Sequence, residues 1–154
     1  MSLRRSRGFT LLEMMLVLVL AGVVMGMAGV QLGRDPQRLA SQEAGLFLQL
    51  VEHARQQAVL EGQEMGVHID DRGYQLMKAS GRSWVSAGPR RDTGLDLRLS
   101  IDGFPVMLAG PGNATQLVFD RNDEYTPFSL SFHEAGVSLA QLSSDGLNDP
   151  WLER

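Results

Sequence analysis

Gly8-Phe9-Thr10-Leu11-Leu12-Glu13 joins a short basic start to a long apolar run, and this junction decides the architecture of the chain. The run covers residues 14–30, which are 17 positions without a charged or strongly polar side chain. As an α-helix, residues 9–30 would measure about 33 Å, close to the roughly 30 Å hydrocarbon thickness of a bilayer. The sequence therefore predicts a transmembrane helix over residues 9–33.

Charge on the two sides of this helix predicts its orientation. Residues 1–8 hold three arginines and no acid, whereas Arg34, Asp35 and Arg38 beyond the helix are of mixed sign. Cytoplasmic flanks of membrane helices carry an excess of Lys and Arg. We therefore expect a single-pass protein of the inner membrane, with a cytoplasmic N-terminus and its later residues on the periplasmic side.

The pattern beyond the apolar run predicts an α+β body. Pro36 kinks the first helix or begins a second one, with Asp35 as its N-cap. Apolar residues three and four apart predict an amphipathic helix that ends near Gly62, after which the period changes to two. The expected strands are 65–69, 74–78, 95–101, 106–108, 116–119, 128–132 and 137–142. We expect about seven antiparallel strands in one or two sheets, joined at 70–73 by a hairpin turn, with the helix packed on them.

The composition excludes several kinds of site. The chain has no cysteine, which rules out disulfides, thiolate metal ligands and cysteine nucleophiles. His53, His68 and His133 lack the paired spacing of a zinc site, so they are expected on the surface or on strands. No nucleophile elbow or phosphate-binding glycine loop is present. The sequence therefore predicts no enzyme activity, no catalytic residue, no cofactor and no metal.

Two further features limit the partners and ligands of the body. The oxygen-bearing side chains at 120–124 include Asp120 and Asp123 and raise the question of Ca²⁺, but a solvated turn is preferred because the EF-hand glycine and distant glutamate are missing. Without residues 1–8 the chain has 11 basic and 18 acidic residues, a net charge of −7. Such a charge disfavours nucleic acid as a partner, because phosphate contacts require Lys and Arg.

The two tryptophans lie outside the predicted strands. Trp84 is expected in a loop packed against a sheet, and Trp151 in the C-terminal tail as a contact for another subunit.

Two simpler interpretations of the N-terminal segment remain open at this point. In one, the segment is a secretory signal cleaved after Ala28, and the mature chain is a periplasmic enzyme; in the other, it is a plain anchor. The apolar run exceeds the roughly 7–15 residues of a signal core. A carboxylate within a membrane helix costs about 2.5–3.5 kcal/mol, so Glu13 calls for a partner. Both features favour a third interpretation.

The junction from Gly8 to Glu13 resembles the type III signal sequence of type IV pilins and type II secretion pseudopilins. The resemblance implies that a prepilin peptidase cuts after Gly8 and that the exposed Phe9 is then N-methylated. It also implies that Glu13, fifth in the mature chain, pairs with the N-terminal amine of a neighbouring subunit during assembly. Residues 1–8 would be the cleaved leader, 9–33 the transmembrane and assembly helix, and 34–154 a periplasmic pilin-like domain.

The remaining chain is similar to the H-type minor pseudopilins of type II secretion. The similarity rests on the helix at 39–61 and on the segment 117–130 with Thr126-Pro127, although Asn122-Asp123-Glu124 stands where relatives have a glycine turn. It implies an adaptor between the tip complex and the major pseudopilin shaft, which supports export of folded proteins across the outer membrane. The implied partners are the major pseudopilin, the other minor pseudopilins, the prepilin peptidase and the inner-membrane assembly platform. A minor type IV pilin acting in pilus assembly, motility or DNA uptake is the alternative.

Overall fold

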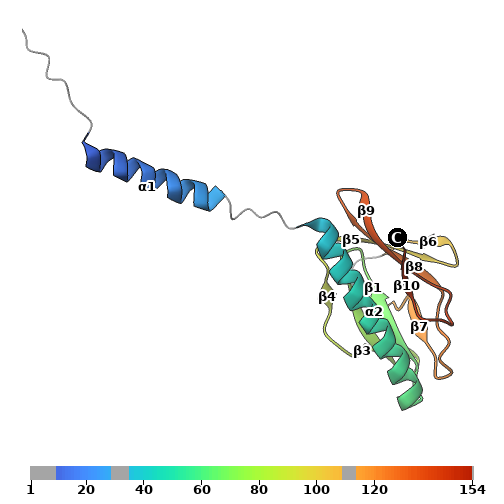
Figure 1. The fold of residues 1–154 in the computed structure, drawn as a ribbon. Coiled ribbons are helices and arrows are strands. Elements are labelled where there is room, and N and C mark those ends of the chain that lie inside the picture. The colour runs from blue at the N-terminus through green and yellow to red at the C-terminus, as the bar shows by residue number, and fades with distance from the viewer. Residues whose placement is uncertain (1–9, 29–34, 109–113, 154) are drawn as a thin grey trace, which may run out of the picture. The chain divides into compact units, whose positions relative to one another are not determined.

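The computed structural model describes residues 10–28, 35–108 and 114–153, the side chains of 24–28 excepted (Figure 1). The chain divides into two compact units between Arg34 and Asp35. The first unit contains helix α1 (Leu11–Ala28), and the second contains helix α2 (Pro36–Glu61) and the strands. No helix within the described ranges reaches the length and hydropathy required of a membrane span. The predicted span 9–33 extends past both ends of α1 into residues outside those ranges, so it stays a prediction.

Helix α2 begins and ends at the residues that the sequence predicts. The Asp35 Oδ1 accepts a hydrogen bond from the Gln37 N–H at 3.1 Å, and Pro36 occupies the first turn. Both features are typical of a helix N-terminus. Unpaired N–H groups there need acceptors, and proline, which has no N–H, breaks no hydrogen bond of the helix at this position. At the other end, Gly62 adopts the left-handed conformation and its N–H donates to the Ala58 carbonyl. The interpretation of Pro36 as the start of a second helix is therefore confirmed.

The strands form two antiparallel sheets, each of five strands in the described part of the chain (Figure 1). The first sheet has the order β3-β2-β1-β7, with β4 also paired to β2; the second has the order β10-β9-β8-β5-β6. The first contains β1 (Met65–Ile69), β2 (Gly73–Ser80), β3 (Ser83–Ser86), β4 (Arg91–Asp92) and β7 (Leu117–Phe119). The second contains β5 (Asp96–Ile101), β6 (Phe104–Val106), β8 (Phe128–Glu134), β9 (Val137–Ser144) and β10 (Trp151–Glu153). The predicted α+β class and the hairpin between β1 and β2 are confirmed.

Three short strands and several strand boundaries differ from the prediction. Strands β3, β4 and β10 were not expected, and β6 lies at 104–106 rather than 106–108. Trp84 therefore lies on β3 and Trp151 on β10, not in a loop and a tail. Strands of two to four residues are too short to show a period of two, so only pairing with a neighbour defines them. The expected packing of Trp84 is correct, because its ring lies directly over Gly66 of β1.

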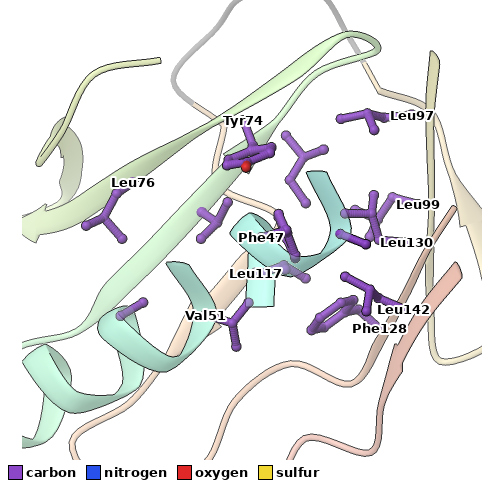
Figure 2. Packing of buried hydrophobic residues seen from close by; sticks show 14 of the residues in the cluster. Phe47, Val51, Tyr74, Leu76, Leu97, Leu99, Leu117, Phe128, Leu130 and Leu142 are labelled. Atoms are coloured by element: carbon purple, nitrogen blue, oxygen red, sulfur yellow. The ribbon is translucent and has the colours of Figure 1, made fainter. Parts of the chain in front are cut away.

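The core lies between α2 and both sheets, which α2 contacts through β1, β7, β8 and β9. Figure 2 shows Phe47 of α2 among Tyr74, Leu130 and Phe128. Its ring meets Tyr74 of the first sheet edge-on at 5.0 Å between centroids, and Phe128 of the second at 5.9 Å. Edge-to-face pairs of this kind contribute about 0.5–1.5 kcal/mol beyond the area that they bury. Apart from Glu43, the remaining buried residues of α2 are small or β-branched: Ala40, Ala44, Val51, Ala54 and Ala58.

The buried His133 on β8 predicts a pH dependence of stability. Burial, and next the Arg98 guanidinium, lower the pKa of His133 below its ordinary 6.5. The unfolded chain therefore takes up this proton at a higher pH than the folded chain, and the His133 contribution is lost as the pH falls below about 6.5. We expect urea titrations to give a lower free energy of unfolding at about pH 5.5 than at about pH 7.5, with a smaller difference for His133→Gln.

The exposed His53→Gln serves as the matched control, because its removal leaves the buried imidazole in place. Asp70 also has a lowered pKa, because Arg90 hydrogen-bonds its carboxylate, but that contribution is lost only below about pH 4. The two pH windows are thus separate. An equal pH response in the wild-type and His133→Gln chains would contradict the assignment.

Candidate functional site

The first turn of α1 contains the predicted assembly residue, Glu13. Thr10 precedes the helix, and its Oγ1 accepts a hydrogen bond from the Glu13 N–H at 3.3 Å. Thr and Glu three residues apart at a helix start have the spacing of a capping box, and an acid is favoured at this end of the helix dipole. The local sequence therefore fixes where α1 starts and places the carboxylate in its first turn. Gly8 and Phe9 lie outside the described residues.

The side chains of α1 form an apolar surface on every face of the helix. The large apolar residues between Leu11 and Val23 are 51–80% exposed, and Glu13 is the one charged residue of α1. A helix that is apolar all round is stable only when something apolar covers it, such as lipid or other helices. The segment thus has the chemistry of a surface that lipid or other helices cover.

Two buried ion pairs in the body escaped the sequence analysis. Arg90 binds Asp70 through Nε and Nη2 at 2.7 and 2.8 Å, and Arg91 binds Glu43 in the same two-pronged way at 2.9 and 2.7 Å. The Asp70 side chain is 1% exposed and that of Glu43 is 7% exposed. The missed signal was Glu43 itself, because it stands within the apolar stripe of α2, where a charge requires a partner. Arg90 and Arg91 thereby fix the segment before β4 against β1 and α2.

A third arginine joins distant parts of the body. Arg55 of α2 binds Asp123 through Nε and Nη2 at 2.9 and 3.0 Å, and Asp149 through Nη1 at 2.7 Å. Its guanidinium also lies 5.0 Å from the centre of the Tyr125 ring, a cation–π distance. Asp123 has a φ of 67°, the left-handed conformation that glycine usually supplies. This pairing anchors Asp123 to α2.

The oxygen-bearing loop at 120–124 is bound within the protein. The Asp120 Oδ1 accepts hydrogen bonds from the N–H groups of Asn122 at 2.7 Å and Glu124 at 3.1 Å. These bonds, the one from Asn122 first, lower the pKa of Asp120. Asp123 is already paired with Arg55. Within the described ranges, no three acidic or histidine side chains gather as metal ligands would.

The predicted histidines lie on separate elements: His53 on α2, His68 on β1 and His133 on β8. His68 is buried and its Nδ1 contacts the Ala114 carbonyl oxygen. The positions agree with the expectation of surface or strand residues. The three histidines therefore do not form a shared site.

Comparison with known proteins identifies the family. The Prokaryotic N-terminal methylation motif matches residues 3–29, a range that includes Gly8, Phe9 and Glu13. The family Type II transport protein GspH matches residues 43–146. Type II secretion system protein H of Pseudomonas aeruginosa is 31% identical over 98% of this chain and 98% of its own length. The protein of the same name from Escherichia coli is 33% identical over 92% of this chain and 89% of its own length.

Solved structures agree with these sequence matches. The solution structure of E. coli GspH has a TM-score of 0.65 at 25% identity, and covers 79% of this chain and 94% of that one. The crystal structure of the minor pseudopilin EpsH from the type II secretion system of Vibrio cholerae has a TM-score of 0.65 at 23% identity, which supports the fold. It covers 75% of this chain and 94% of that one.

These matches decide between the interpretations of the sequence. The resemblance to H-type minor pseudopilins is confirmed, and the family is one of structural subunits rather than of known enzymes. The methylation motif implies anchoring in the inner membrane. The matches name a secretion protein in each case, which favours the pseudopilin over the minor type IV pilin. The chain therefore belongs to the type II transport protein GspH family and is a minor pseudopilin of type II secretion.

Proposed function

We propose that this minor pseudopilin is an adaptor that joins the tip complex to the major pseudopilin shaft and so supports export of folded proteins across the outer membrane. The observation that supports the proposal is α1, which is apolar on all faces and carries Glu13 as its one charge. Such a helix is built to be covered by the helices of other subunits. The family resemblance supplies the place of the subunit between tip and shaft.

We propose the following course for the N-terminal segment. Residues 1–8 are a leader that the prepilin peptidase removes on the cytoplasmic side, and Phe9 is then N-methylated. Residues 9–33 stay in the inner membrane, and residues 34–154 form the periplasmic domain. The arginines before the apolar run favour this orientation. The inner-membrane assembly platform then receives the subunit.

The role of Glu13 follows from the burial of charge. A lone carboxylate among apolar helices is unfavourable, whereas the same carboxylate beside the N-terminal amine of a neighbouring subunit forms an ion pair in a medium of low dielectric constant. The pair forms only when the neighbour stands in register. We propose that Glu13 thereby favours correct addition of subunits.

Replacement of Gly8 by phenylalanine is expected to block processing. A bulky side chain next to the scissile bond would crowd the cleft of the peptidase. Mass spectrometry of the purified chain should then show residues 1–8 still attached, whereas the wild type should begin at methylated Phe9. Gly22→Ala is the control, because a Cβ at this position of α1 meets nothing within 4 Å. A Gly8→Phe chain that begins at Phe9 would contradict the proposed cleavage by the prepilin peptidase.

The adaptor role is tested by contacts in both directions. The full chain would be produced together with the major pseudopilin, the other minor pseudopilins and the peptidase, with single cysteines introduced into its cysteine-free sequence for crosslinking. An adaptor should give crosslinks to the major pseudopilin from one set of positions and to tip subunits from another. Crosslinks to the major pseudopilin alone would indicate a shaft subunit instead.

A further inference from the structure

A groove of about 550 Å³ lies between α2 and the segment 87–91 that leads into β4. Helix α2 supplies Leu46, Gln49, Leu50 and His53 to one wall, and β2 supplies Tyr74 and Leu76. The volume is within the roughly 300–1,000 Å³ range of sites that hold small ligands or a few side chains. We call this hollow the α2–β4 groove.

The wall formed by residues 87–91 is held in place before any partner binds. The Gly88 carbonyl accepts hydrogen bonds from Gln75 Nε2 at 2.9 Å and from Ser86 Oγ at 2.8 Å. Arg90 and Arg91 fix the end of the same segment to the carboxylates of Asp70 and Glu43. A preformed groove loses little conformational entropy on binding, which favours affinity.

The surface of the groove includes apolar side chains. Leu46 is 38% exposed although it is a large apolar residue on a well-packed helix. Tyr74 is 3% exposed, and its hydroxyl is buried beside the Glu43–Arg91 ion pair. Burial, and next the Glu43 carboxylate, raise the pKa of Tyr74 to about 12, so the hydroxyl keeps its proton.

The acidic and basic side chains at the groove differ in their exposure to solvent. The carboxylates of Asp70 and Glu43 lie beneath the surface, at 1% and 7% exposure, whereas the side chains of Arg90 and Arg91 are 35% and 45% exposed. An incoming partner therefore meets the exposed parts of both guanidinium groups, with Asp92 beside Arg90 at 3.7 Å. Guanidinium groups bind carboxylates with good geometry. The complementary ligand has an apolar side chain next to an acid.

We propose that the α2–β4 groove binds a segment of a neighbouring pseudopilin in which a large apolar side chain stands beside a carboxylate. The inference rests on the proposed function, because the partner is a subunit of the same assembly. The apolar side chain would cover Leu46 and Leu50, and the carboxylate would face Arg90 and Arg91. The groove would thus be a subunit contact of the body, distinct from the contacts of α1.

Two matched pairs of α2 variants test the groove. Leu46→Gln removes an apolar contact at the groove, and Leu60→Gln makes the same change at a position that is 84% exposed and lies outside it. Gln49→Glu and Gln49→Lys change charge at the groove, and Gln56→Glu and Gln56→Lys do so outside it. The full-length variants would be produced with the other pseudopilins, extracted in mild detergent, and assayed for retention of each subunit.

We expect Leu46→Gln to weaken retention of one subunit about tenfold, Gln49→Glu to weaken it and Gln49→Lys to strengthen it. The variants outside the groove should behave as the wild type. Circular dichroism melts that match the wild type would show that the body is folded, and Gln49, being exposed, gives a charge test that does not depend on Leu46.

Three results would overturn the proposal. If Leu46→Gln and Leu60→Gln bind alike, the groove is not a subunit contact, although the adaptor role stands. If Gln49→Glu strengthens retention, the partner is basic rather than acidic. If the folded, processed wild type retains no pseudopilin, the adaptor role and the groove proposal fail together.

Discussion

Glu13→Ala is expected to leave cleavage of the leader intact and to abolish entry of the subunit into the pseudopilus. Loss of one partner from a buried charge pair typically costs about 2–5 kcal/mol, which is more than a tenfold loss of affinity. The same substitution makes membrane insertion easier by about 2.5–3.5 kcal/mol, so the amount of subunit in the membrane should not fall. Mass spectrometry would report cleavage, and crosslinking to the major pseudopilin would report assembly.

Glu13→Gln is the matched control for shape. It keeps the length of the side chain and removes the charge, so it should fail in assembly as Glu13→Ala does. Leu60→Gln, at a position of α2 that is 84% exposed, serves as a control outside α1. Normal assembly of the Glu13→Ala chain would show that the charge pair is not required.

Gly146→Ala is expected to give a large loss of stability in the body. Gly146 has a φ of 82°, and a Cβ there would overlap the Tyr125 carbonyl oxygen and come within 3.1 Å of Pro127 Cγ. The left-handed conformation costs about 1–2 kcal/mol for alanine, and overpacking against backbone adds about 1–3 kcal/mol. We expect a free energy of unfolding lower by about 3 kcal/mol, seen as a fall in Tm of roughly 10 °C.

Gly136→Ala separates the two parts of this effect. Gly136 also has a φ of 82°, in the turn between β8 and β9, but a Cβ there meets nothing within 4 Å. It should therefore show the conformational cost alone, about 1–2 kcal/mol. Equal losses for the two variants, measured by thermal unfolding of the full chain in detergent, would mean that the Tyr125 segment moves aside without cost.

The sequence predicted those parts of the fold that have a long regular pattern. Helix α2 could be read from its spacing, from Asp35-Pro36 and from Gly62, because caps and periodicity are local signals. The long strands β8 and β9 could be predicted for the same reason. Strand β4 has two residues and β10 has three, so their existence depends on β2 and β9 rather than on their own composition.

The polar contacts of the body could not be predicted in this way. Glu43 and Arg91 are 48 positions apart, and Arg55 and Asp123 are 68 apart. Charged side chains of this kind look like surface residues in a linear pattern, and only the approach of distant elements turns them into ion pairs. The N-terminal assembly residues are the opposite case, since Gly8, Phe9 and Glu13 form a short motif that can be recognised without a fold.

The sheet order has a consequence for when the body can fold. Gln37, at the start of α2, donates to the Leu139 carbonyl 102 positions later at 2.7 Å, and Arg55 binds Asp149 94 positions later. If residue 35 crosses the membrane first and residue 153 last, the part of the apolar face of α2 that β8 and β9 cover stays open until those strands arrive. Pairings of such long range also form slowly. A chain truncated before β9 would keep the contacts of α2 with β1, β7 and β8 but would expose the rest of its apolar face to proteases.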